Sequence, residues 1–113
     1  MRQARGRLQR VLRALAEPRR IAILKLVHDR ELAAGEIAEH FRTTRQAVSQ
    51  HLKVLREAGL VNERRDGTRR LLSVRPEGLA DLHGFLAEVV PSSLERLKRA
   101  AEDEERHAGH DRN

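Results

Sequence analysis

Residues 45–58 carry a row of polar side chains at helical spacing, and their types are those that recognise nucleic acid. On a wheel drawn at about 100° per residue, the long donors and the short hydroxyl and amide groups share one arc. The arc comprises Arg45, Gln46, Ser49, Gln50, Lys53, Arg56 and Glu57. Because glutamine pairs with adenine, arginine and lysine with guanine or phosphate, and serine with several bases, the arc is suited to a DNA major groove.

The opposite arc of the same segment is apolar, with Val48, Leu52 and Leu55 as its large members. This back predicts a helix that is fixed to a domain while its polar front faces outward. Thr44 is the expected N-cap, since its hydroxyl can accept a hydrogen bond from a free backbone N–H. Gly59 is expected to end the helix in a left-handed conformation.

A second basic group follows the recognition segment. The stretch "LVNERRDGTRRLLSV" indicates two strands joined by Asp66-Gly67, a pair typical of tight hairpin turns. The turn is flanked by Arg64, Arg65, Arg69 and Arg70. Such a basic ribbon can follow the phosphate backbone or enter a neighbouring minor groove, where arginine is favoured.

Charge is divided unevenly along the 113 residues, whose formal net charge is +6 and pI about 11.1. Residues 1–75 hold 18 Lys and Arg against 8 Asp and Glu, a net of +10, whereas residues 76–113 hold 5 against 9, a net of −4. The positive field therefore belongs to the first two thirds and favours a polyanionic partner. Aromatic residues make up only 2% of the chain, which argues against base stacking on single strands and favours double-stranded DNA.

Several other functions are disfavoured by residues that are missing. The absence of cysteine excludes disulfides, thiolate metal sites and cysteine nucleophiles. No carboxylate pair, Ser-His-Asp arrangement or glycine-rich phosphate loop is apparent, so we expect neither an enzyme nor a cofactor. No apolar run approaches the roughly 18 residues of a membrane span. The arginine-rich N-terminus superficially resembles a transit peptide, but its apolar spacing runs into the next helix, so a cytoplasmic protein is expected.

Three helices are expected before the recognition segment. The first has an apolar stripe formed by Leu8, Val11, Leu12 and Leu15. Pro18 opens the second, at about residues 18–28, and the third covers about residues 34–41. The third helix, the short "RTT" connection and the recognition segment together predict a helix-turn-helix.

After the hairpin, Pro76 is expected to open a fifth helix that Pro91 breaks. The capping box Ser92-x-x-Glu95 indicates a weaker sixth helix, and disorder is expected after Arg106. The predicted fold is thus mainly α with a small β-hairpin: a winged helix-turn-helix of five to six helices. Residues 1–106 would form the DNA-binding and dimerisation domain, and residues 107–113 a disordered tail.

Three stretches, "ALAEPRRIAIL", "EIAEHFRTTRQAVSQHLKVLREAGLV" and "RRDGTRRLLSV", resemble the ArsR/SmtB family of bacterial winged-helix repressors. The resemblance covers about residues 8–90 and implies a homodimer that leaves a palindromic operator when an unidentified effector, such as a small molecule, binds. It also implies a DNA-facing set made of Thr44, Arg45, Gln46, Ser49, Gln50 and Lys53. His51 matches the Ser-x-His that is frequent in the family, but the wheel places it near the packed side, which favours a structural role.

The chain departs from the family's metal sensors at both familiar sites. Ala33 and Gly35 stand where such sensors carry Cys-x-Cys. Asp81-Leu82-His83 matches half of the fifth-helix site, but Leu94 and Leu97 occupy the positions of the completing ligands. We therefore expect no metal site, with a metal-responsive repressor using Asp81 and His83 as an alternative. His107-x-x-His110 is a weaker candidate still.

The first and fifth helices offer more apolar surface than a small core can cover, which predicts a homodimer. The expected interface comprises Leu8, Val11, Leu12, Leu15, Leu82, Phe85, Leu86 and Val89. A second alternative is a winged helix that docks a protein and does not bind specific DNA; the basic hairpin argues against it.

Overall fold

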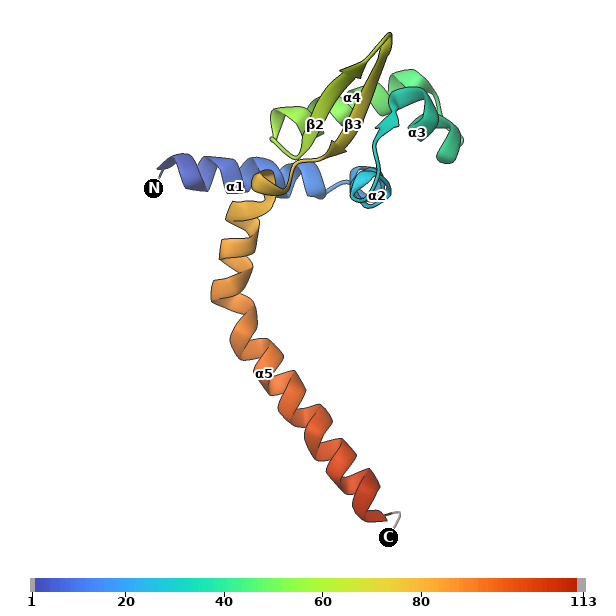
Figure 1. Cartoon of the computed structure of the whole chain (residues 1–113). Helices are drawn as coiled ribbons and strands as arrows, with labels where there is room; N and C mark the ends of the chain where they lie inside the picture. Colours follow the sequence, from blue (N-terminus) through green and yellow to red (C-terminus); the bar gives the residue numbers. More distant parts are fainter. Residues whose placement is uncertain (1, 112–113) are drawn as a thin grey trace. The chain divides into compact units, whose positions relative to one another are not determined.

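A computed structural model describes the backbone of residues 2–111 and the side chains of residues 5–90 and 95–104. The chain divides into two compact units, residues 1–82 and residues 83–113 (Figure 1). The elements are α1 (Arg2–Leu15), α2 (Pro18–Val27), β1 (Leu32–Ala33), α3 (Ala34–His40), α4 (Arg45–Glu57), β2 (Val61–Asp66), β3 (Arg69–Val74), the 3₁₀ helix η1 (Pro76–Leu79) and α5 (Ala80–Asp111).

The core of the first unit is built from one apolar side of each helix, together with the base of the sheet. Its largest fully buried side chains are Val11, Ile23, Val27, Ile37, Val48, Leu55 and Leu60. The predicted back of α4 is thus packed, as Val48, Leu52 and Leu55 are all buried. Among the described residues no polar or charged side chain is fully buried, so hydrophobic packing holds this unit together.

Helices α3 and α4 end in the same backbone arrangement, a Schellman motif. At the end of α4, Leu60 and Gly59 donate to the carbonyls of Leu55 and Arg56, and Gly59 has φ 74°, as the sequence predicted. At the end of α3, the corresponding left-handed residue is Arg42, with φ 53°. This turn leads the chain to Thr44, whose hydroxyl accepts from the Ala47 N–H at 3.1 Å and caps α4 as predicted.

The sheet has three antiparallel strands in the order β1-β3-β2, one more than the predicted hairpin. The short strand β1 pairs Leu32 with Leu72 and Ala33 with Leu71. Sequence patterning missed it because two residues are too few to show alternation. The hairpin turn is also one residue later than predicted: Asp66 pairs with Arg69, so Gly67 and Thr68 form the turn, and Gly67 adopts φ 64°.

The second unit consists of the long helix α5 beyond its first turn. The predictions of a break at Pro91 and of a separate sixth helix are wrong, because α5 is continuous from Ala80 to Asp111. Proline removes one backbone hydrogen bond, to the carbonyl four residues earlier. Here that carbonyl belongs to Ala87, which is exposed, so solvent can hydrate it.

Two further boundaries differ from the prediction. Pro76 begins η1, and the α-helix proper starts at Ala80. The helical backbone also runs to Asp111, past the predicted onset of disorder at residue 107. Among the described residues, no helix combines the length and apolar character needed to cross a membrane.

Candidate nucleic-acid interface

The polar face of α4 is solvent-exposed along its length. Thr44, Arg45, Gln46, Ser49, Gln50, Lys53 and Arg56 are all exposed. The cap at Thr44 fixes where the helix starts, and the buried back fixes its rotation, so these side chains share one outward face. α3 packs against α4 as the preceding helix of a helix-turn-helix.

The wing arginines, defined as Arg64, Arg65, Arg69 and Arg70, are likewise exposed. They lie on the wing, which is the hairpin formed by β2 and β3. This hairpin extends away from the core to the turn at Gly67 (Figure 1). β2 buries only its first residue, Val61, so most of the strand is free on the surface. The wing arginines are therefore accessible to a partner from solvent.

Three of the four wing arginines form ion pairs with carboxylates. Arg64 donates from Nε and Nη2 to the two carboxylate oxygens of Glu31, each at 2.9 Å. Glu31 directly precedes β1, and β3 lies between β1 and β2, so the arginine reaches across one strand to its partner. This bidentate bond lowers the pKa of the Glu31 carboxyl from its ordinary value and raises the pKa of Arg64.

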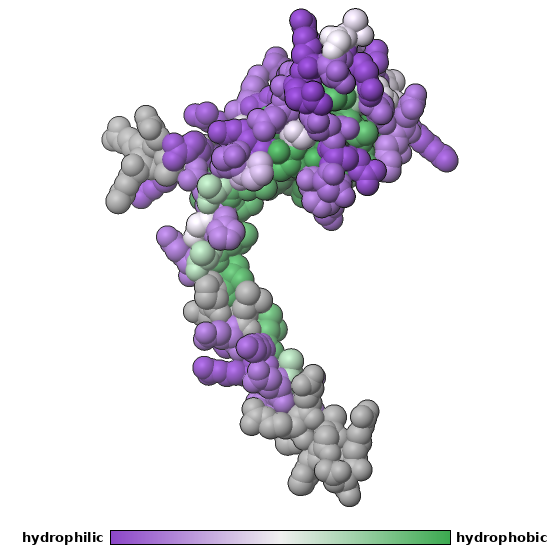
Figure 2. Space-filling view, in the orientation of Figure 1, coloured by the Kyte–Doolittle hydropathy of each residue, from purple (hydrophilic) through white to green (hydrophobic). Residues whose placement is uncertain are grey.

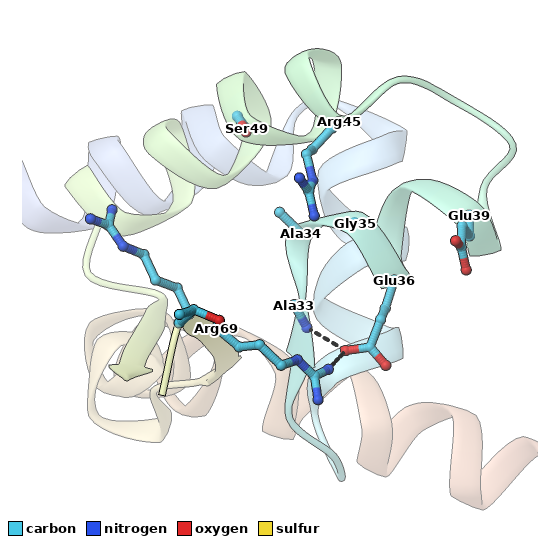
Figure 3. A pocket seen from close by; sticks show the side chains of 10 residues that line it. Ala33, Ala34, Gly35, Glu36, Glu39, Arg45, Ser49 and Arg69 are labelled. Atoms are coloured by element: carbon cyan, nitrogen blue, oxygen red, sulfur yellow. Dashed lines mark hydrogen bonds and ion pairs between the residues drawn. The ribbon is translucent and has the colours of Figure 1, made fainter. Parts of the chain in front are cut away.

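Arg69 is held at the first turn of α3. Its Nη2 donates to Oε1 of Glu36, and the same oxygen accepts from the Ala33 backbone N–H at 3.0 Å (Figure 3). The bond from the Ala33 N–H, together with Arg69, holds the pKa of the Glu36 carboxyl below its ordinary value. Glu36 thus caps a helix and binds a wing arginine at once.

Glu63, on β2, connects the wing to α4. Its carboxylate accepts from Arg56 Nη1 of α4 at 2.8 Å and lies 3.7 Å from Arg70 Nε of β3. Among the described side chains, Arg65 is the wing arginine that forms no ion pair or hydrogen bond. The four wing arginines therefore differ in how freely they can bind an anion.

An open cleft of about 490 Å³ lies between the start of α3, α4 and the wing (Figure 3). Arg45 points from α4 toward Gly35 in this cleft. A Cβ atom at residue 35 would lie 2.7 Å from Arg45 Nη2, so only glycine leaves room for this arrangement. Arg45 therefore lies against the start of α3.

Comparison with known proteins identifies this arrangement. Residues 17–63 match the family model described as "Bacterial regulatory protein, arsR family". The HTH-type transcriptional regulator Rv2034 of Mycobacterium tuberculosis is 48% identical over 73 residues, which cover 65% of this chain and 68% of that protein. The chain belongs to the ArsR family.

Two other proteins are similar in sequence or structure. The transcriptional repressor SdpR of Bacillus subtilis is 35% identical over 60 residues, covering 53% of this chain and 67% of the repressor. The solution structure of the homodimeric winged helix-turn-helix DNA-binding domain Mb0332 of Mycobacterium bovis has a TM-score of 0.63 and 34% identity, covering 75% of this chain and 79% of that one. The predicted winged helix-turn-helix of a transcriptional regulator is thereby confirmed.

His51, which matches the family's Ser-x-His, lies on the partly buried side of α4. Its Nδ1 has no hydrogen bond and is 3.9 Å from Oε2 of Glu17, the residue that caps α2. This position links α4 to the start of α2 and faces away from the polar front. The partly buried position agrees with the packed-side placement on the wheel, but Nδ1 lacks the hydrogen-bond partner expected of a structural histidine.

The residues predicted to form the ArsR-type dimer interface fall into two groups. Val11 is only 1% exposed and belongs to the core, so its assignment to the interface is corrected. Leu8, Leu15 and Leu82 are partly buried, the last two against that core. The exposed members are Leu12 at 44%, Phe85 at 43%, Leu86 at 42% and Val89 at 53%. Hydrophobic surface along α5 is visible in Figure 2.

The residues at the family's two metal positions do not fit a metal. Ala33 and Gly35 offer no ligand, and Asp81 accepts a 2.8 Å hydrogen bond from Arg7 Nε. His83 is exposed, and no group of three or more potential ligands occurs among the described residues. The side chains of Leu94, His107 and His110 lie outside the described part of the chain.

Sequence reasoning missed the carboxylates that bind the wing. Glu36 could have been found as an acidic residue in the first turn of α3, where it stabilises the free N–H groups. Glu31 could not, because its proximity to Arg64 depends on the unpredicted strand β1. Glu63 was visible only as one of two acids among the hairpin's arginines.

Proposed function

We propose that the chain is a homodimeric repressor that binds a palindromic operator in double-stranded DNA. Three features support this: the exposed polar face of α4, the wing arginines beside it, and membership of the ArsR family. The names of SdpR, a repressor, and of the homodimeric Mb0332 domain point in the same direction. The action would be cytoplasmic, where the operator is.

The observation that carries this proposal is the orientation of α4, with its back buried and its front exposed. α4 enters the major groove, and Gln46 and Ser49, near its N-terminal end, face base edges. Lys53 and the wing arginines contact phosphates or the neighbouring minor groove. In a dimer with two-fold symmetry, the two α4 helices would be about one DNA turn, roughly 34 Å, apart.

The dimer would form through exposed apolar residues of α1 and α5, namely Leu12, Phe85, Leu86 and Val89. An effector that favours a dimer with a different α4 spacing would release the operator. A small molecule is a candidate for this effector. A metal effector is disfavoured, since Arg7 already engages Asp81.

Selection of bound sequences from a random DNA pool tests the proposal. The expected result is an enriched inverted repeat whose half-sites are about one helical turn apart. Binding should weaken steeply with salt, because phosphate contacts release counterions. If no sequence is enriched and binding does not depend on salt, the chain is instead a protein-interaction module with a winged-helix fold.

A further inference from the structure

The carboxylates around the wing balance its positive charge. Four arginines project from the wing, and four acidic residues lie on it or bind to it: Glu63, Asp66, Glu31 and Glu36. The formal charge of this group is therefore zero, although the first 75 residues carry a net charge of +10. Two of the acids, Glu31 and Glu36, come from outside the hairpin.

These ion pairs are expected to contribute little to the stability of the fold. All the groups involved are exposed, and exposed ion pairs contribute little to the free energy of unfolding because water screens them. Their geometry is nevertheless specific, since Glu31 receives two parallel bonds from the Arg64 guanidinium. A phosphate uses this same two-pronged geometry when it binds arginine.

We propose that Glu31 and Glu36 compete with DNA phosphates for Arg64 and Arg69 and so limit the sequence-independent affinity of the wing. The inference rests on the proposed DNA-binding function and adds residues that set its strength. In the free protein the guanidinium donors face carboxylates. A phosphate can engage them fully only by displacing the acid, and the freed carboxylate then lies near a polyanion.

The competing groups remain charged under the conditions of binding. The bond from Arg64 lowers the pKa of Glu31, and the bond from the Ala33 N–H lowers that of Glu36. Both carboxyls are therefore ionised at neutral pH, where the chain would bind DNA. Arg65 has no such competitor among the described side chains, and it is the wing arginine that is free to bind a phosphate first.

The opposite role is also conceivable and has the opposite sign. If Glu31 served to hold Arg64 ready for DNA, its neutralisation would weaken binding. If it competes, neutralisation strengthens binding. Glu31→Gln separates the two roles because glutamine can still accept a hydrogen bond from Arg64 but carries no charge. Glu36→Gln similarly keeps the cap of α3, since Gln can take the place of Glu in that contact.

The experiment measures the affinity of the full chain for a short duplex of random sequence across a salt series. Each of the variants Glu31→Gln and Glu36→Gln should bind more tightly than wild type. The slope of log affinity against log salt should steepen by up to about 0.9 for one added phosphate contact, or about eight-fold in affinity per ten-fold dilution of salt. Thermal unfolding of each variant confirms that the fold is retained.

Glu39→Gln is the matched control. Glu39 lines the same cleft and is exposed, but it forms no ion pair among the described side chains, so this variant changes net charge equally and frees no arginine. Its affinity should rise by about two-fold or less, since salt screens unpaired surface charge. An equal rise for Glu39→Gln and Glu31→Gln would overturn the proposal by showing a simple charge effect.

A double variant tests whether Glu31 acts through Arg64. In an Arg64→Ala background, Glu31→Gln should have no larger effect than Glu39→Gln has. If wild type binds in a salt-sensitive way but Glu31→Gln binds equally or more weakly, the competition is refuted while the proposed DNA-binding function stands. Absence of salt-sensitive binding by wild type would instead refute the proposed function itself.

Discussion

At the scale of single residues, the side chains of the proposed DNA-binding surface differ in whether they already bind another group of the protein. Gln46 and Ser49 are exposed on α4 and form no side-chain hydrogen bond among the described residues, so they can pair with bases without breaking a contact. Arg64 and Arg69 must first exchange a carboxylate for a phosphate. Residues that the sequence presented as equivalent therefore differ in whether an existing contact must break before they bind DNA.

Replacement of Gln46 tests its role as a base reader. Gln46→Ala should cost roughly 1–3 kcal/mol in binding the selected operator, because one bidentate base contact is lost. Binding to random DNA should change little. Both affinities can be measured by fluorescence anisotropy across a salt series, with Gln3→Ala on α1 as a control remote from α4 in the sequence. Equal losses on both DNAs would mean that Gln46 is a phosphate anchor.

Arg65 should act as the main phosphate anchor of the wing. Arg65→Ala should weaken operator and random DNA to a similar extent and reduce the salt slope by about one unit. Arg64 is the neighbour of Arg65 in the same strand. Arg64→Ala should reduce the affinity and the salt slope by less, because Arg64 is already bound to Glu31. The same anisotropy series measures the difference, and a loss confined to the operator would assign Arg65 to base reading instead.

Zinc should not control this protein. A zinc site needs four ligands, and Asp81 is already bound by Arg7, which leaves His83 without a partner ligand at the matching positions. A calorimetric titration of the chain with zinc should show no tight stoichiometric binding. Tight binding that His83→Ala abolishes, coupled to release of DNA, would contradict this prediction.

At the scale of elements, those with a repeating apolar pattern or a clear cap or turn residue were predictable, and those defined by pairing with distant residues were not. The helices and the hairpin follow from apolar spacing and from Thr44, Gly59 and Gly67. Strand β1 could not be predicted, because its two residues are defined by pairing with β3. The break predicted at Pro91 was also wrong, because α5 continues through this proline although it removes a backbone hydrogen bond.

The candidate site was predictable to the same extent. The polar face of α4 follows from periodicity, and the wing arginines follow from the hairpin. Their ion pairs with Glu31 and Glu36 depend on contacts between residues 33 positions apart, which no local pattern encodes. The exposed surface was thus predictable, whereas the state of each arginine on it required the tertiary structure.

The end of α3 gives a prediction at the element scale. Arg42 has a left-handed backbone, which costs an L-residue roughly 1 kcal/mol, and it occupies the position that glycine fills at the end of α4. Arg42→Gly should therefore raise the free energy of unfolding by about 1 kcal/mol, as measured by urea denaturation. Arg42→Ala is the control: it removes the same side chain but keeps the strained backbone, so it should bring no such gain.

At the scale of the whole molecule, the exposed apolar residues require a partner. Phe85, Leu86 and Val89 are between 42% and 53% exposed on one helix, and soluble monomers rarely leave such a stripe uncovered. A second copy of this chain would cover it with an identical stripe, as two-fold symmetry demands. The proposed recognition of a palindromic operator depends on this pairing, because two α4 helices at a fixed separation would be needed to bind its two half-sites.

Sedimentation of the chain at micromolar concentration should therefore show a dimer. Leu86→Glu should raise the dimer dissociation constant by about thirty-fold or more, because it places an unpaired charge in an apolar interface. Glu88→Gln, two residues away and also exposed, should leave that constant nearly unchanged. Circular dichroism should show both variants folded, since Leu86 is not part of the core. A wild-type monomer would contradict the prediction and, with it, the palindromic operator, because a single α4 has only one half-site to read.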